Sequence, residues 1–363
     1  MIEFKELDKF LIFLVIVIFI IGISCIYSAS YNKGFEVTKN YALRQISWML
    51  IGFFILMPLF ILIDYQKIID FGYVMYLLGL VVLAMVLVLG HIRSGAQRWF
   101  SIAGFNIQPS EFNKIIYIVT MASYLGHKRA DIFNIKGLII PLALTAIPFI
   151  LILLQPDLGT ALILVPVAFA MLFMAGAQPK HLAGIGFCGI AMSPLFWHFL
   201  KVYQKNRLLV FLNPNIDPLG AGYTVIQSKI AIGSGGLFGK GWLAGTQNQL
   251  NFLPERHTDF IFSVIGEEWG LIGAVVLTGL YFLVLRRGLM IIDRTTDIYG
   301  KLLGTGIVTM LGFQIFVNIS MTMGFMPVVG LPLPLMSYGG SSLWTTLITI
   351  ALLLNIGMRR TRF

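Results

Sequence analysis

The sequence contains few charged residues and few cysteines, and each shortage excludes some classes of protein. Only 12% of its 363 residues are charged, against about 25% in soluble domains, and mean hydropathy is +0.87. The two cysteines, Cys25 and Cys188, both lie within apolar runs, so a disulfide framework is not expected. No cluster of Cys and His has metal-ligand spacing. These shortages argue against a soluble protein, a disulfide-rich secreted domain and a zinc-centred fold.

What fills the sequence instead is a series of apolar runs of about 17 to 25 residues, the length that crosses a hydrocarbon core of about 30 Å. The first run is too long for a secretory signal peptide, so we expect it to be retained. We predict an all-α, polytopic membrane protein in which residues 1–363 form one domain with about ten transmembrane helices. The predicted spans are residues 10–28, 45–63, 71–90, 110–125, 138–154, 160–176, 182–199, 260–285, 302–325 and 339–357.

The distribution of Lys and Arg predicts the orientation of these spans. Fourteen of the 26 Lys and Arg residues fall in segments that face the cytoplasm if both termini do. Five fall in the short outer segments, six in the long loop 201–258 and one in a span. The bias predicts cytoplasmic termini and an extracytoplasmic loop between spans seven and eight. Net charge is +10, but no basic helix carries interleaved aromatics, so we expect membrane lipids and no nucleic acid as partners.

Two segments do not fit regular membrane helices. Residues 91–109 contain Arg93, Arg98 and Pro109, and we expect an outer-surface or shallow re-entrant stretch there. Residues 326–338 contain three prolines, which exclude a regular helix. Backbone of this kind is tolerated at membrane depth only against protein or a wet cavity. The two segments therefore predict an outward-facing pocket.

Two polar groups near predicted helix starts each allow a structural and a functional interpretation. Glu111 and Lys114 are three residues apart, so they share one helix face and can form a salt bridge. Ion pairs inside membranes are often functional as well, and lining of a substrate cavity is an equal alternative. Asp157 is best interpreted as the N-cap of the next helix.

Four ionisable side chains crowd into Glu255–Asp259, directly before an apolar run. Asp259 is the best candidate for chemistry, because a partly desolvated carboxylate has a raised pKa and can act as a general base. On spacing alone, an N-cap for a helix that begins at Phe260 is slightly favoured. His257 has no partner set for a metal, so we expect it to hydrogen-bond within the loop. Of Glu267 and Glu268, one is expected to pair across helices.

Several motifs resemble those of the SEDS family, named for shape, elongation, division and sporulation. The similarity runs from about residue 93 to the C-terminus, and the late loop Val328–Pro334 resembles the elongation branch more than the division branch. The motifs are Gln108–Glu111, Gln155–Thr160, Asn206–Leu209 with Asn213-Pro214, Asp217-Pro218, Gly222-Tyr223, Leu253–Glu268 and Leu333–Ser342.

The resemblance implies a peptidoglycan glycosyltransferase that polymerises lipid II at the outer face of the cytoplasmic (inner) membrane, for cell elongation and rod shape. It forms β-1,4 links and releases undecaprenyl pyrophosphate. The family's essential aspartate falls on Asp259, and its paired charges fall on Glu111 and Lys114. The expected partner is a class B penicillin-binding protein, a transpeptidase.

For the leaving pyrophosphate, the candidate positive charges are Lys114, Arg98 and Arg207, and a divalent cation (Mg²⁺ or Mn²⁺) is an option although no resident cofactor is predicted. Glu255 and Ser337, which lie in the matching motifs, complete the predicted substrate-binding set. Two alternatives stay open at this point. A flippase for lipid-linked precursors would need charged groups along a path through the bilayer, and a non-catalytic scaffold would leave Asp259 as a helix cap.

Overall fold

The computed structural model describes residues 6–31, 40–93, 96–102, 105–128, 131–200, 202–217, 220–250 and 252–359. Within these ranges, eight helical segments are long and apolar enough to cross a membrane. They are α1 (Lys9–Ser30), Tyr41–Leu62 (α2 Tyr41–Ile51, a π-helical turn Gly52–Leu56 and α3 Met57–Leu62), α5 (Gly72–Leu89), Ile135–Leu154 (a 3₁₀ turn and α7 Ile139–Leu154), α8 (Leu158–Ala175), α15 (Gly270–Arg294), α16 (Ile298–Thr322) and α17 (Gly340–Arg359). The chain is therefore a multi-pass membrane protein, mostly helical as predicted.

Two of the ten predicted spans, residues 110–125 and 182–199, are not among these eight segments. α6 (Pro109–His127) begins with a polar turn that contains Glu111 and Lys114, and this turn lowers its hydropathy. The predicted span 182–199 is divided between two shorter helices, α9 (Pro179–Ala191) and α10 (Ser193–Phe199). The count of ten spans stays a prediction.

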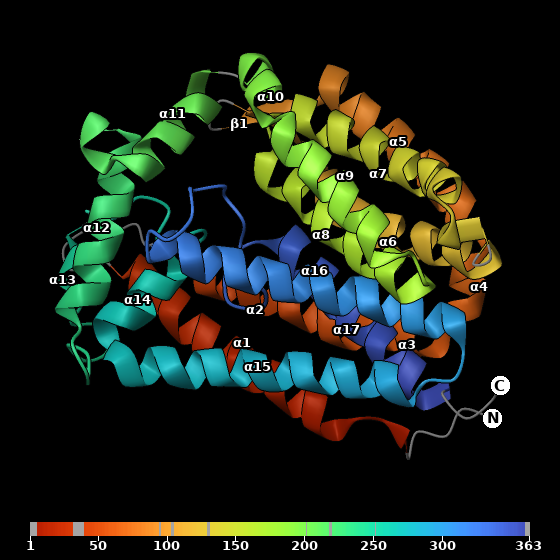
Figure 1. The fold of residues 1–363 in the computed structure, drawn as a ribbon. Helices are drawn as coiled ribbons and strands as arrows, with labels where there is room; N and C mark the ends of the chain where they lie inside the picture. Colours follow the sequence, from red (N-terminus) through yellow and green to blue (C-terminus); the bar gives the residue numbers. More distant parts are fainter. Residues whose placement is uncertain are drawn as a thin grey trace.

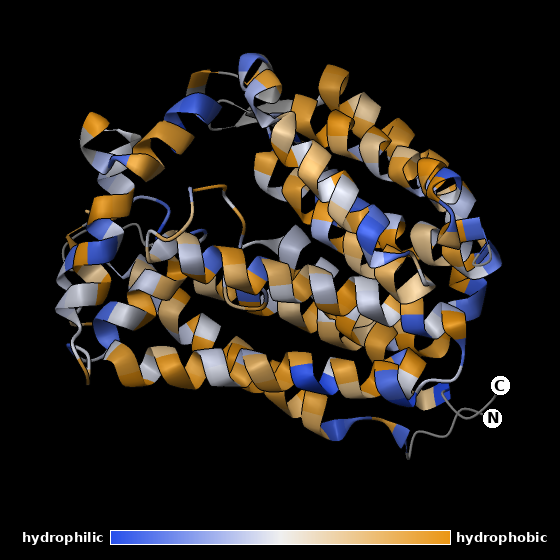
Figure 2. Ribbon diagram, in the orientation of Figure 1, coloured by the Kyte–Doolittle hydropathy of each residue, from blue (hydrophilic) through white to orange (hydrophobic). Residues whose placement is uncertain are grey.

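The long helices surround α16 and α17, whose side chains form much of the core. α16 packs against α6, α8, α15 and α17. Figure 1 shows α1, α2, α15, α16 and α17 running side by side, with α5 to α9 grouped together and α10 to α12 arching away from them. In Figure 2 the ribbons of the long outer helices are predominantly orange, or hydrophobic. α5, for instance, leaves Leu77 64% and Val88 77% exposed, as lipid-facing helices do.

Three short strands between α5 and α6 form a small antiparallel sheet, which the all-α prediction did not include. Its strands are β1 (His91–Arg93), β2 (Ala96–Ile102) and β3 (Phe105–Ile107), in the order β1-β2-β3. β2 lies against α5 and α6, and β3 against α17. The strand pairing provides hydrogen-bond partners for backbone N–H and C=O groups that would lack them in an irregular segment.

The prediction of one span over 260–285 is wrong. The chain forms α14 (Ile261–Glu268), buried along its whole length, and then turns into α15. Gly270 has φ +66, a left-handed conformation that favours glycine, and this ends the first helix. The amides of Leu271 and Ile272 donate to the carbonyls of Gly236 and Leu237, at 2.9 and 3.2 Å. Hydropathy averaged over a whole span does not detect this break, because long apolar stretches lie on both sides of Glu267 and Glu268.

The loop 201–258 is largely structured in its described parts. It contains α11 (Val202–Leu212), a 3₁₀ turn at Pro214–Ile216, α12 (Ala221–Ser234) and α13 (Thr246–Gln249). α12 packs against α14 and α16. Residues 326–338 contain no helix, as the prolines predicted. The remaining short elements are α4 (Tyr65–Asp70) and the 3₁₀ turns Asp131–Phe133 and Ile135–Leu138.

Candidate active site

The loop that carries Asp259 lies directly against the proline-containing segment 326–338. The Ser337 hydroxyl donates to the Thr258 carbonyl at 2.6 Å, and the Tyr338 amide donates to the His257 carbonyl at 2.9 Å. From α16, the Asn318 side-chain amide donates to the carbonyl of Asp259 at 2.9 Å. Three hydrogen bonds thus fix the backbone of three successive residues around the candidate carboxylate.

The proline-containing segment is itself held by buried polar groups. The Ser337 hydroxyl accepts from the Leu333 amide at 2.8 Å, and Asn318 also donates to the Leu331 carbonyl at 2.7 Å. Gln45 on α2 is fully buried, donates to the Ser337 carbonyl and accepts from the Gly339 amide. Ser337 was predicted to bind substrate, and its hydroxyl is engaged between the two loops.

Asp259 does not cap the following helix. The N-cap position of α14 is Phe260 and has no side-chain hydrogen bond, so the cap interpretation is wrong. The half-buried carboxylate instead faces Gly330, whose φ of +75 suits glycine. A Cβ at Gly330 would lie 3.4 Å from Oδ2 of Asp259 and 4.0 Å from Nη1 of Arg207. The glycine therefore leaves room where the carboxylate and the guanidinium converge.

The surroundings of Asp259 raise its pKa to about 6, mainly because burial disfavours the charged form. The negative charge of Glu255, and more weakly that of Asp157, acts in the same direction. The positive charges of Arg207 and Arg98 oppose the increase. A carboxylate with this pKa is mostly ionised at neutral pH yet basic enough to accept a proton in a reaction.

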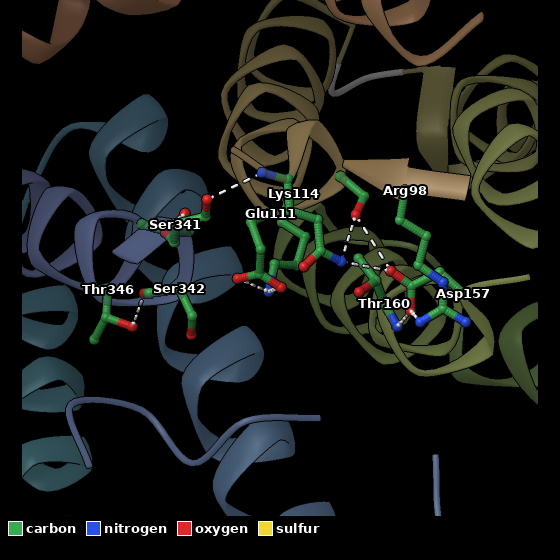
Figure 3. Close-up of polar contacts among 11 residues, drawn as sticks. Arg98, Glu111, Lys114, Asp157, Thr160, Ser341, Ser342 and Thr346 are labelled. Atoms are coloured by element: carbon green, nitrogen blue, oxygen red, sulfur yellow. Dashed lines mark hydrogen bonds and ion pairs between the residues drawn. The ribbon is translucent and has the colours of Figure 1, made fainter. Parts of the chain in front are cut away.

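A second polar cluster surrounds Asp157 (Figure 3). Its carboxylate accepts from the Thr160 amide at 3.3 Å, which confirms the predicted N-cap of α8. It also accepts from the side chains of Gln108 at 2.9 Å and Ser110 at 3.2 Å, and lies 3.7 Å from Arg98. Arg98 donates to the Gln155 and Pro156 carbonyls as well. This cluster joins β2, α6 and the start of α8.

Glu111 and Lys114 form the predicted salt bridge on one face of α6. Nζ lies 2.9 Å from both carboxylate oxygens, and the two residues are 3% and 1% exposed. Figure 3 shows the pair between the Asp157 cluster and Ser341 of α17. In a pair this buried, the charge of each side chain is compensated by that of the other. That the pair lines a substrate cavity remains a prediction.

Glu267 binds the segment that precedes the Asp259 loop, and Glu268 pairs across helices with α1, as expected for one of the two. Glu267 accepts from Lys240 at 3.0 Å and from the Asn248 side chain at 2.9 Å. Glu268 accepts from the Ser28 hydroxyl of α1. The ring of His257 stacks on Tyr41, with centroids 4.6 Å apart.

Sequence reasoning missed Asn318 and Gln45, which position the Asp259 loop. The available signal was a polar amide within an otherwise apolar helix, which calls for a partner in a membrane. Among the described residues, no three or more His, Cys, Asp and Glu side chains form a group that could hold a metal ion.

Comparison with known proteins decides the family. The profile of the FtsW, RodA and SpoVE proteins, described as "Cell cycle protein", matches residues 8–362. The chain belongs to this family. It is 35% identical to the peptidoglycan glycosyltransferase RodA of Treponema pallidum over 98% of both chains. It is 42% identical to the peptidoglycan glycosyltransferase MrdB of Escherichia coli, over 79% of this chain and 77% of that one.

Solved structures agree with the family over the whole fold. RodA of Thermus thermophilus superposes with a TM-score of 0.72 at 32% identity, covering 98% of each chain. A chain from a study titled "Structural coordination of polymerization and crosslinking by a peptidoglycan synthase complex" gives a TM-score of 0.84 at 36% identity. That match covers 98% of this chain and 99% of the other. The SEDS resemblance predicted from the motifs is confirmed.

Proposed function

We propose that this chain is a peptidoglycan glycosyltransferase that polymerises lipid II, with Asp259 as its general base. The activity class is that of curated relatives matched over nearly their whole length. The observation that carries the mechanism is the half-buried carboxylate with its raised pKa, fixed by backbone hydrogen bonds beside Arg207. Polymerisation joins disaccharides by β-1,4 links and releases undecaprenyl pyrophosphate.

In this mechanism Asp259 removes the proton from the acceptor sugar hydroxyl as the oxygen attacks the donor's anomeric carbon. The C–O bond to the diphosphate breaks on the opposite face, so the α-linked donor becomes a β-linked product. Negative charge develops on the leaving diphosphate and needs a nearby cation. Of the three predicted cations, Lys114 is buried against Glu111, and Arg98 is bound to Asp157 and carbonyls. Arg207 lies beside Asp259, and this position favours it for the role.

The remaining parts of the proposal concern the setting of the enzyme. We place the site at the outer face of the cytoplasmic membrane, with ten spans and both termini inside. A class B penicillin-binding protein is the proposed partner, supported by the peptidoglycan synthase complex of the matched structure. A Mg²⁺ or Mn²⁺ ion that travels with the substrate's diphosphate stays part of the proposal.

The test is polymerisation of purified lipid II by the wild type and by Asp259→Asn, with and without a chelator. We expect no glycan polymer from the variant, while its thermal unfolding and its elution as a monodisperse species match the wild type. Normal glycan chains from the variant would refute the assignment. Movement of labelled lipid II across liposomes without any polymer would favour the flippase alternative instead.

A further inference from the structure

A cavity of about 430 Å³ lies where three membrane helices end, away from the candidate active site. Its lining comes from the start of α1 and the last turns of α15 and α17, and Figure 1 shows these three ends at the same end of the bundle. The 25 residues of α15, about 36 Å of helix, separate α14 from this cavity. The cavity is therefore on the opposite face of the membrane from Asp259. Its volume is within the range of about 300–1,000 Å³ that is typical of small-ligand sites.

Three cations from two helices line this cavity. Lys9 is the first residue of α1, and Arg287 and Arg294 lie seven residues apart on one face of α15. Within the described part of the chain, neither Lys9 nor Arg294 forms an ion pair. The cavity is thus bordered by two positive charges that the described residues do not compensate.

The third cation, Arg287, is held in place by its neighbours. Its Nη2 lies 3.1 Å from Oδ1 of Asp8, the oxygen that also caps α1 by accepting from the Leu11 amide at 3.0 Å. The guanidinium carbon lies 5.1 Å from the centre of the Phe10 ring. Nε of Arg287 is buried and has no hydrogen-bond partner among the described residues. Because buried donors normally have an acceptor, this nitrogen is consistent with an acceptor that a ligand supplies.

The charge balance of the cavity favours an anion as that ligand. The three cations are opposed by two carboxylates, Glu6 and Asp8. Asp8 is compensated by Arg287, and Glu6 also has an interaction partner. Ammonium and guanidinium groups both bind phosphate oxygens well, the first as a point charge and the second in a bidentate manner. A phosphate ester is therefore the ligand group that suits Lys9 and Arg294.

An apolar surface continues from the cavity into the membrane. Phe10 lines the cavity and is 42% exposed, and Phe13, one turn deeper on α1, is 57% exposed. The two rings stack, with centroids 6.4 Å apart. Leu7, Met290 and Leu354 add apolar walls to the cavity itself. A soluble phosphate gains nothing from this surface, whereas the acyl chain of a lipid does.

We propose that this cavity binds the phosphodiester head group of an anionic phospholipid, with Lys9 and Arg294 on the phosphate and an acyl chain along Phe10 and Phe13. Basic pockets between membrane helices bind head groups of this kind. With both termini in the cytoplasm, as proposed above, the lipid comes from the cytoplasmic leaflet, whose anionic lipids attract basic segments. The site is separate from the glycosyltransferase site and does not depend on the proposed activity.

The test measures binding of dioleoyl phosphatidylglycerol to the delipidated full-length protein in detergent, by native mass spectrometry, which counts bound lipids. The wild type should bind a first phosphatidylglycerol more tightly than later ones. Lys9→Gln and Arg294→Gln should each weaken this first step about fivefold, the loss typical of one charge near a lipid surface. The double variant should weaken it roughly 25-fold if the two contacts are independent. Lys9→Arg and Arg294→Lys should keep most of the affinity.

Arg286→Gln is the matched control. Arg286 is the exposed neighbour of Arg287 on α15 and does not line the cavity, so its variant should change the first step by less than about twofold. Lys9 and Arg294 are exposed as well, so their variants should fold and elute as monodisperse species. Arg287 is kept, because its loss would also break the ion pair with Asp8. Equal losses in Arg286→Gln and Arg294→Gln would show diffuse attraction only and would overturn the site.

Other ligands test the chemistry of the head group. Phosphatidylcholine, whose quaternary ammonium cancels the phosphate charge, should bind about fivefold more weakly or worse. Glycerol 3-phosphate has the phosphate but no acyl chain, and it should compete only at a far higher concentration than the lipid. Equal affinity for phosphatidylcholine and phosphatidylglycerol would overturn the anionic assignment. Competition by glycerol 3-phosphate at the lipid's own concentration would overturn the assignment to a lipid.

Discussion

Glu111 and Asp259 are both carboxylates, but their surroundings give the first a structural role and leave the second able to react. Glu111 lies within α6, is almost fully buried, and has both oxygens on Lys114. Asp259 lies in a loop, is only half-buried, and is fixed through its backbone instead of its carboxylate. The charge of Glu111 is compensated by Lys114, whereas the carboxylate of Asp259 has a raised pKa and can accept a proton. A reactive carboxylate in a membrane protein is thus marked by support for its backbone and space beside its oxygens.

The largest effect is expected when the ion pair between Glu111 and Lys114 is broken. Lys114→Met leaves the Glu111 carboxylate buried without its partner, and removal of one partner from a buried pair costs about 3–5 kcal/mol. We expect this loss in the free energy of unfolding, measured by denaturant titration in detergent. The double variant Glu111→Leu/Lys114→Met should recover most of it. A single variant as stable as the wild type would contradict the structural role of the pair.

The next effect concerns the backbone support of Asp259. Asn318→Leu leaves the carbonyls of Asp259 and Leu331 without their donor and loosens the loop by a fraction of an ångström. Because misplacement of a catalytic group by about 1 Å can cost about 100-fold, we expect polymerisation to fall roughly 10- to 100-fold, mainly in kcat. Steady-state kinetics with lipid II would measure this change.

Gln314→Leu is the matched control for Asn318→Leu. Gln314 lies one turn earlier on α16, is 2% exposed, and has no hydrogen bond within the described residues. It should polymerise at close to the wild-type rate. Equal losses in both variants would mean that α16 is merely sensitive to polar-to-apolar changes.

A smaller effect is expected at the second polar cluster. Asp157→Ala removes the N-cap of α8, and loss of such a cap costs typically about 1 kcal/mol. The variant also removes the ion pair between Arg98 and residue 157. Arg98 keeps its hydrogen bonds to the Gln155 and Pro156 carbonyls. Thermal unfolding should show a modest decrease in midpoint. A cap contribution is disproved if Asp157→Asn and Asp157→Ala both match the wild type.

The smallest effect is expected from removing the charge of Glu255, which influences the pKa of Asp259. The exposed Glu255 raises the pKa of Asp259, so Glu255→Gln should lower that pKa. The acid limb of the pH–rate profile then moves toward lower pH by a few tenths of a unit, since solvent screens an exposed charge. The shift should diminish at 0.5 M salt. A limb that moves toward higher pH would contradict the sign of this interaction.

The raised pKa also gives a stability prediction. A carboxyl whose pKa is higher in the folded state than in the unfolded one favours folding when protonated, so its ionisation above about pH 6 disfavours the fold. Asp259→Asn removes that penalty. At pH 7.5 the variant should unfold at the same temperature as the wild type or at a higher one. A clear decrease would show that the carboxylate itself holds the loop.

Much of this molecule follows from local sequence, and the rest depends on tertiary contacts. Hydropathy predicts the long helices, prolines predict the irregular segment 326–338, and the spacing of Glu111 and Lys114 predicts their pairing. The break at Gly270 escapes prediction because it depends on backbone donors and acceptors contributed by residues 236–241. The role of Asn318 escapes it because its two carbonyl partners lie in different loops. Spacing alone favoured a cap at Asp259, and only the fold shows that its Oδ2 lies next to Gly330.

The most direct measurement for the central claim is the pH dependence of kcat/KM for polymerisation, measured with lipid II well below saturation, because kcat/KM reports the pKa values of the free enzyme. For the wild type, the rate should fall tenfold per pH unit below an apparent pKa near 6, because the protonated Asp259 cannot accept the acceptor's proton. Asp259→Glu should keep such a limb, and any residual activity of Asp259→Asn should show none. A wild-type profile that is flat from pH 5 to 8, or the same limb in Asp259→Asn, would contradict the account.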